Sequence, residues 1–98
     1  MNPSEIKTHV LDVWRYLKEH PELNSITADS RELDLKLYVD GEYMPLKKLT
    51  CFLTFSEYPV FWKKSNEYFY KWLYAKDNSV KIKYSNKIIR LIELWEPK

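Results

Sequence analysis

The sequence predicts an α+β domain in which an N-terminal amphipathic helix and a second helix pack on an antiparallel sheet of about four to five strands. Apolar residues recur at helical spacing near the N-terminus, and a period of two appears over three later segments, 32–39, 49–55 and 80–84. A two-residue turn signal separates the predicted strands in the first half. The expected order is α-β-β-β-α-β-β over a single domain of residues 1–98.

The first helix has a start signal, an apolar stripe and a stop signal. Asn2, Pro3 and Glu5 supply an N-cap, a first-turn proline and an acid three positions after the cap. His20 and Pro21 end the helix, because proline disfavours helical geometry in the residue before it. The apolar stripe, which we expect to face the sheet, consists of Ile6, Val10, Val13, Trp14 and Leu17.

The predicted sheet begins where the period changes to two, at Glu32. Asp40-Gly41 is a hairpin signal that needs positive φ, so residues 42–46 are expected to return as an antiparallel strand, with Pro45 at an edge or bulge. Residues 49–55 alternate again and predict a third strand, although a helix that starts at Pro45 is the competing interpretation. The inward-facing residues of the first strand are Leu33, Leu35, Leu37 and Val39.

A second helix of about ten residues is predicted, with Ser65 as its cap and its end near Asp77 and Asn78. Its periodicity places Tyr70 and Tyr74 opposite the core. The residues expected to face the core are Tyr68, Phe69, Trp72 and Leu73. The chain is then expected to close with strands over 80–84 and 88–95, but residues 88–95 also fit helical spacing, so a terminal helix is the alternative.

Composition narrows the function classes. Charges interrupt every apolar stretch before the roughly 20 residues that a membrane-spanning helix needs, and the N-terminal residues lack the apolar region of a secretory signal. The single cysteine, Cys51, excludes an intramolecular disulfide and is expected to be buried on a strand. These features favour a cytoplasmic protein. Residues 1–56 hold seven basic against nine acidic residues, whereas residues 57–98 hold nine against five.

Several kinds of catalytic site are missing from the sequence. With Gly41 as the only glycine, no P-loop or dinucleotide fingerprint can form. His9 and His20 lie about three turns apart on one predicted helix, so neither is expected to bind metal. Asp34-Leu35-Lys36 has the D-x-K form of metal-dependent nucleases, with Asp29 as an uncertain second ligand, but charges on a strand's solvent face give the same letters. We expect neither an enzyme nor a cofactor.

The aromatic residues point to binding. Ten of the sixteen lie between Phe52 and Tyr74, and surface Tyr and Trp carry much of the energy of protein interfaces. The leading hypothesis is a protein-binding module that docks on a partner or on a second copy of itself. Its expected anchors are Tyr58, Trp62, Tyr70 and Tyr74, with a rim of Lys63, Lys64 and Lys71.

Nucleic-acid binding by the basic C-terminal half is the alternative, because lysines interleave with aromatics there. The candidate phosphate contacts are Lys76, Lys81, Lys83, Lys87 and Arg90. The composition, rich in Lys, Tyr, Asn and Ile with few Ala and Gly, is similar to that of many phage accessory proteins. The most specific form of the binding hypothesis is therefore an anti-CRISPR-like inhibitor that occludes a host nuclease defence complex.

Overall fold

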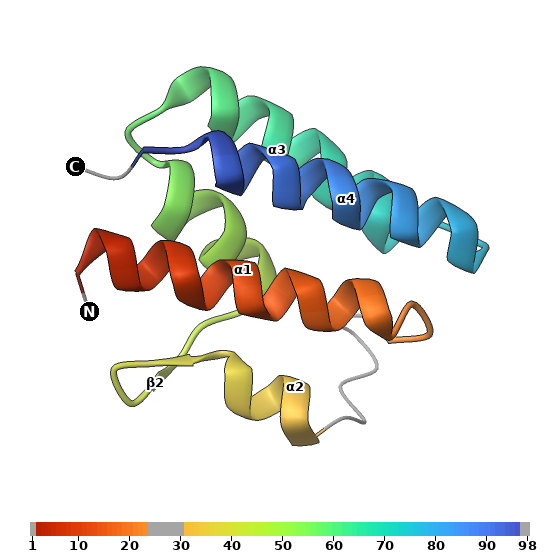
Figure 1. Ribbon diagram of the computed structural model, residues 1–98, viewed down its shortest axis with the longest axis horizontal. Coiled ribbons are helices and arrows are strands. Elements are labelled where there is room, and N and C mark those ends of the chain that lie inside the picture. The colour runs from red at the N-terminus through yellow and green to blue at the C-terminus, as the bar shows by residue number, and fades with distance from the viewer. Residues whose placement is uncertain (1, 24–30, 97–98) are drawn as a thin grey trace.

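The computed structural model describes residues 2–23 and 31–96 and shows a mostly helical chain (Figure 1). The predicted sheet of four to five strands is wrong, because the strands of the described residues form one two-stranded antiparallel hairpin. The elements are α1 (Pro3–Glu19), α2 (Arg31–Lys36), β1 (Tyr38–Val39), β2 (Glu42–Tyr43), the π-helical segment η1 (Lys48–Leu53), α3 (Pro59–Leu73) and α4 (Asn78–Leu94).

Helix α1 forms as the sequence predicts. The Asn2 side chain accepts a hydrogen bond of 2.9 Å from the Glu5 amide, and Pro3 occupies the first turn. His20 is the C-cap residue. The buried side of the helix carries Val10, Val13, Trp14 and Leu17.

The strand predicted from Glu32 to Val39 exists only at its end, as β1, and the residues before it form the short helix α2. Leu33 and Leu37 are buried, whereas Leu35 is 61% exposed, so the alternation does not describe the buried face. Residues four apart lie on the same side of a helix, and one turn therefore suffices to turn Leu33 and Leu37 towards the core. The hairpin prediction is confirmed: Asp40 and Gly41 have φ of 52° and 83°, and they join β1 to β2.

The third predicted strand is also wrong, and the competing helical interpretation from Pro45 is correct. The Leu49 amide donates to the Pro45 carbonyl at 2.9 Å, and η1 follows. Both of the alternating sets in this segment contain buried residues, among them Leu49, Thr50 and Thr54. Alternation in the sequence therefore did not correspond to a buried and an exposed face.

The C-terminal half contains the predicted second helix, with other bounds, and a further long helix in place of the two predicted strands. Helix α3 begins at Pro59, and Ser65 is not its cap but a buried residue whose hydroxyl donates to the Trp62 carbonyl at 2.9 Å. The residues of the strands predicted over 80–84 and 88–95 belong to α4, except for Trp95, which is its C-cap residue. Its N-cap is Asp77, whose carboxylate accepts from the Val80 amide at 2.9 Å. The terminal helix considered for residues 88–95 is thus present and begins ten residues earlier, at Asn78.

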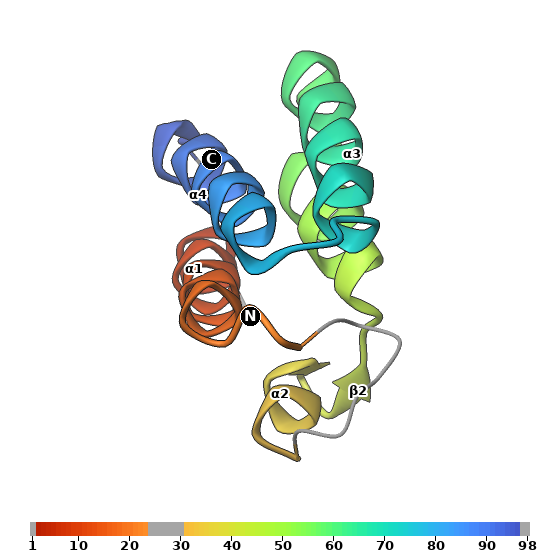
Figure 2. The ribbon, with the colours of Figure 1, turned by 90° about the vertical axis from the view of Figure 1, so that its right-hand side faces the viewer.

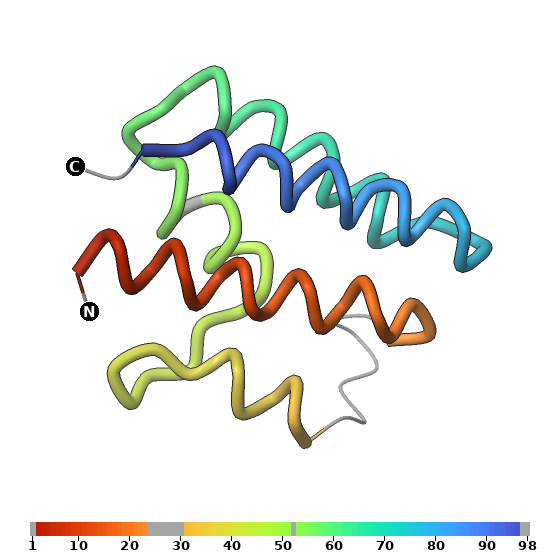
Figure 3. Tube along the Cα trace, in the orientation of Figure 1, coloured from red at the N-terminus to blue at the C-terminus, as the bar shows by residue number. Residues whose placement is uncertain are grey.

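The helices surround one core. Helix α4 packs against both α1 and α3, and α2 with the hairpin lies on the other side of α1 (Figures 1 and 2). From the hairpin the chain passes through η1 to the start of α3, which Figure 3 traces. Trp14 of α1 meets α3 at the centre, with its ring 6.3 Å from that of Phe69 and 5.1 Å from that of Trp72. Its Nε1 donates a 2.8 Å hydrogen bond to the Thr50 hydroxyl of η1.

The bond between Trp14 and Thr50 gives a test of this core. Thr50→Val keeps the shape of the side chain but leaves the buried Trp14 Nε1 without its acceptor, which costs about 1–3 kcal/mol. Urea unfolding followed by circular dichroism should show this loss. The same change at exposed Thr8, whose hydroxyl bonds the Ser4 carbonyl, should cost within about 0.5 kcal/mol. Equal effects at the two positions would contradict the central role of this bond.

Candidate interaction surface on α3

One side of α3 presents large aromatic side chains to solvent. Trp62, Tyr70 and Tyr74 are 44%, 37% and 71% exposed. With Asn66 between them they follow a four-residue spacing, so they are neighbours along one side of the helix. We call Trp62, Tyr70 and Tyr74 the aromatic row. The other side of α3 buries Phe69 and Trp72, as the periodicity of the sequence predicted.

The two tyrosines of the row are held in a defined arrangement. Their rings stack with centroids 6.1 Å apart and an angle of 8° between their planes. The Lys47 ammonium, from the turn before η1, lies 4.4 Å from the centroid of the Tyr70 ring and donates a hydrogen bond to its hydroxyl. This contact limits the freedom of Tyr70, so that less rotamer entropy remains to be lost on binding.

A groove lies beside Trp62. Its volume is about 380 Å³, and it is lined by Pro45, Lys47, Lys48, Cys51, Trp62 and Asn66. It therefore lies where η1 and the residues before it meet α3. Lys47 and Lys48 are exposed, as is Lys63 on the turn of α3 that follows Trp62. The Trp62 groove thus combines an apolar floor with lysines around it.

The structure separates the residues that were expected to form one binding surface. Lys63 and Lys64 are exposed on α3. Lys71 is turned towards α4: its ammonium lies 5.7 Å from the centroid of the Tyr84 ring and 3.1 Å from the Glu67 carboxylate. That ion pair, with its hydrogen bond, raises the pKa of Lys71.

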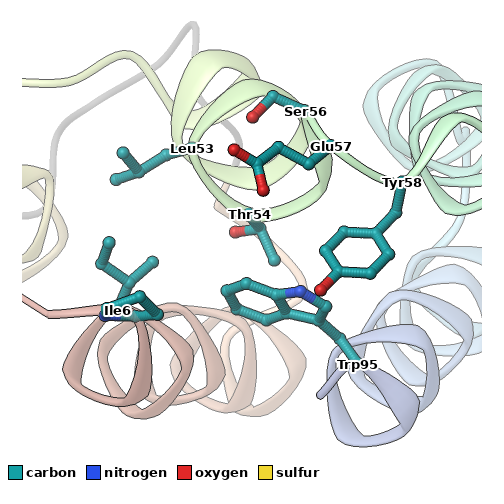
Figure 4. Close-up of a pocket in the computed structure, with 8 residues that line it drawn as sticks. Ile6, Leu53, Thr54, Ser56, Glu57, Tyr58 and Trp95 are labelled. Atoms are coloured by element: carbon teal, nitrogen blue, oxygen red, sulfur yellow. The ribbon is translucent and has the colours of Figure 1, made fainter. Parts of the chain in front are cut away.

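Tyr58 is also apart from the Trp62 groove. It lines a separate pocket of about 200 Å³, where Figure 4 shows its ring beside the indole of Trp95. The Tyr58 hydroxyl donates to the Glu96 carbonyl at 3.1 Å, and its ring stacks on Phe61. Tyr58 therefore holds the start of α3 against the end of α4.

The residues expected to contact nucleic acid differ in their exposure. Lys76, Lys83, Lys87 and Arg90 are exposed, but Lys81 is buried. The Lys81 ammonium lies 4.2 Å from the centroid of the Trp72 ring, and burial lowers its pKa. Lys81 is thus placed in the core and not on a surface that phosphates reach.

The described residues considered for catalysis lie on α1, at its C-cap and on α2, and their contacts are structural. His9 Nε2 donates to the Lys36 carbonyl at 2.7 Å, and the His20 ring stacks on Tyr16. Asp34 and Lys36 lie on helix α2, where residues two apart point in different directions, and Lys36 pairs with Asp12 at 2.6 Å. In residues 2–23 and 31–96 no three His, Cys, Asp or Glu residues cluster so as to hold a metal ion. Asp29 lies outside the described residues.

Cys51 is buried as expected, but in η1 and not on a strand. Burial raises the pKa of its thiol.

Sequence reasoning missed the residues that build the other wall of the groove. The sequence predicts Pro45 and Cys51 on two different strands and assigns no role to Lys47, so it does not bring the three residues together. The helical alternative from Pro45 contained the signal, because it places Lys47 and Cys51 four residues apart on one side.

Comparison with known proteins gives no guide to function: no family model, curated protein or solved structure matches the chain. Over the part of the chain that the structure covers, none of the helices is both long and apolar enough to cross a lipid bilayer.

The buried Lys81 leads to a prediction about pH. Its folded-state pKa lies below the ordinary 10.5, so at neutral pH the folded state carries a charge that burial disfavours. As the pH rises through the lowered pKa towards 10.5, the folded state releases the proton and the penalty is relieved. The stability of Lys81→Met relative to the wild type should therefore be most favourable near neutral pH, and this relative advantage should shrink towards pH 10.5.

The measurement is the difference in unfolding midpoint between wild type and Lys81→Met over this pH range. Lys83→Met is the matched control, since it removes a positive charge from an exposed position of the same helix. An advantage that stays constant with pH would show that Lys81 does not lose its proton more easily in the folded state.

Proposed function

We propose that this protein is a non-catalytic binding module that uses the aromatic row and the Trp62 groove to hold another protein in the cytoplasm. One observation carries the proposal: α3 buries Phe69 and Trp72 but leaves Trp62, Tyr70 and Tyr74 exposed in a single row beside a groove. Exposed Tyr and Trp bury a large area with few rotatable bonds, and they are enriched among the residues that dominate binding energy.

The charges around the groove define the chemistry of the partner. Lys47 and Lys48 line the groove and are exposed, and Lys63 is exposed on α3 next to Trp62 in the sequence. Glu67, on the next turn of α3, is already paired with Lys71. The surface therefore fits a protein segment with an apolar or aromatic side chain for the Trp62 groove and carboxylates on either side of it. Such complementary charges raise the rate of association and fix the orientation of the partner.

The rigidity of the row supports this role. Tyr70 is held between Lys47 and the stacked ring of Tyr74, so the two rings are arranged before any partner arrives. In its most specific form, the proposal is that a phage-encoded chain covers the working surface of a host nuclease defence complex, as an inhibitor without turnover. A second copy of this chain is the alternative occupant.

The proposal is tested by selecting displayed random peptides on the purified protein. We expect the selected peptides to carry an aromatic or large aliphatic residue flanked by Asp or Glu. The double variant Trp62→Ala with Tyr74→Ala should lower the affinity for these peptides about tenfold to thirtyfold, as expected for loss of an interface anchor. Isothermal titration calorimetry measures the effect.

The matched control removes two exposed aromatics elsewhere. Tyr38 and Tyr43 of the hairpin are 44% and 50% exposed, and Tyr38→Ala with Tyr43→Ala should leave affinity for the selected peptides unchanged. If the α3 variant, shown by circular dichroism to be folded, binds the peptides as tightly as the wild type, the proposal is wrong. Sedimentation velocity on the same variants tests self-association: a dimer that only the α3 variant abolishes would make the second copy the occupant.

A further inference from the structure

A second surface of α3, on the side that faces α4, gathers lysines over two tyrosine rings. Tyr68 of α3 and Tyr84 of α4 lie with their centroids 6.1 Å apart, and both are partly buried against the core. Lys71 of α3 reaches over Tyr84, at 5.7 Å from the ring centroid, and Lys87 of α4 reaches over Tyr68, at 5.4 Å. Each helix thus places a lysine over a tyrosine ring of the other helix.

A third ammonium joins this group. Lys83 lies 5.5 Å from the centroid of the Tyr84 ring. Because Lys71 and Lys83 lie over the same ring, their nitrogens are separated by no more than about twice that distance, close to the Debye length of about 8–10 Å in physiological salt. Their fields therefore add at the surface. We call Lys71, Lys83 and Lys87 the lysine cluster.

The surroundings of the cluster contain little negative charge. Residues 59–94, which span α3 and α4, hold eight basic residues and three acidic ones. Glu67 pairs with Lys71, Asp77 caps α4 at the turn, and Glu93 lies in the last turn of α4. Arg90 is also exposed, and it lies about one helical turn after Lys87 on α4. An anion that reaches this face meets several cations and one carboxylate that is already paired.

We propose that the lysine cluster binds the phosphate backbone of a nucleic acid, on a surface separate from the aromatic row and independent of the function proposed for it. Lysine binds phosphate as a point charge from many directions, without the two-pronged geometry by which arginine recognises both carboxylates and phosphates. Such contacts can follow a chain of phosphates whatever its base sequence. The cluster holds three lysines and no arginine. The tyrosine rings lie beneath the ammonium groups, so they support the lysines and are not open platforms for bases.

Binding through phosphates has a measurable signature. The logarithm of the binding constant falls linearly with the logarithm of salt concentration, with a slope of about −0.7 for each single-strand phosphate neutralised. Three lysines predict a slope near −2 for a fluorescein-labelled oligothymidylate, measured by fluorescence anisotropy between about 50 and 200 mM salt. Lys83→Gln with Lys87→Gln should reduce the steepness of this slope by about 1.4 and weaken binding at the lowest salt by about tenfold or more.

Three comparisons make the result decisive. Arg15→Gln with Lys18→Gln removes the same charge from exposed positions of α1 and should leave slope and affinity unchanged, and Lys83→Arg with Lys87→Arg should retain binding. Polyglutamate should compete much more weakly than unlabelled oligothymidylate. The proposal is overturned if the wild type shows no salt-dependent binding, if the α1 variant loses as much affinity as the cluster variant, or if polyglutamate competes equally well. Binding that survives Trp62→Ala with Tyr74→Ala would separate this surface from the aromatic row.

Discussion

The fold depends on a single indole that must satisfy both a packing and a hydrogen-bonding requirement. Trp14 fills the space between α1 and α3 with edge-to-face contacts to Phe69 and Trp72, and its Nε1 needs a buried acceptor, which Thr50 supplies from η1. A buried donor without a partner costs a large fraction of the free energy that stabilises a small domain. The same residue therefore links α1, η1 and α3, and Cys51 of η1 lines the groove beside Trp62.

Helix α3 lies between η1 and α4. This position explains why its aromatic residues are exposed on one side and partly buried on the other. Towards η1, the chain that precedes it covers only part of the helix, and Trp62, Tyr70 and Tyr74 remain exposed next to a groove. Towards α4, a full-length helix covers more of α3, so Tyr68 and Tyr84 are partly buried and only the lysines above them reach solvent. Aromatic side chains of one helix thus serve as candidate anchors on one side and as a support for cations on the other.

Burial also separates lysines that look alike in the sequence. Lys81 and Lys83 are two positions apart, but two positions on a helix differ by about 200° in direction. Lys81 is therefore directed into the core over Trp72, where burial lowers its pKa, and Lys83 lies over Tyr84 at the surface. The number of lysines in the C-terminal half therefore overstates how basic its surface is, because Lys81 is buried.

The sequence by itself determined what local rules control: the cap and stripe of α1, the Asp40-Gly41 turn, and the outward direction of Tyr70 and Tyr74. Only the tertiary structure decided the state of residues 31–37, 45–55 and 78–94. There, apolar residues at a spacing of two predicted strands, although some of the same residues also lie three or four positions apart, as on one side of a helix. The choice follows from burial: a helix brings Leu33 with Leu37, and Ile88 with Ile92, onto one side that packs against the core. The Trp62 groove could not be found from the sequence, because its two walls come from elements that meet only after that choice is made.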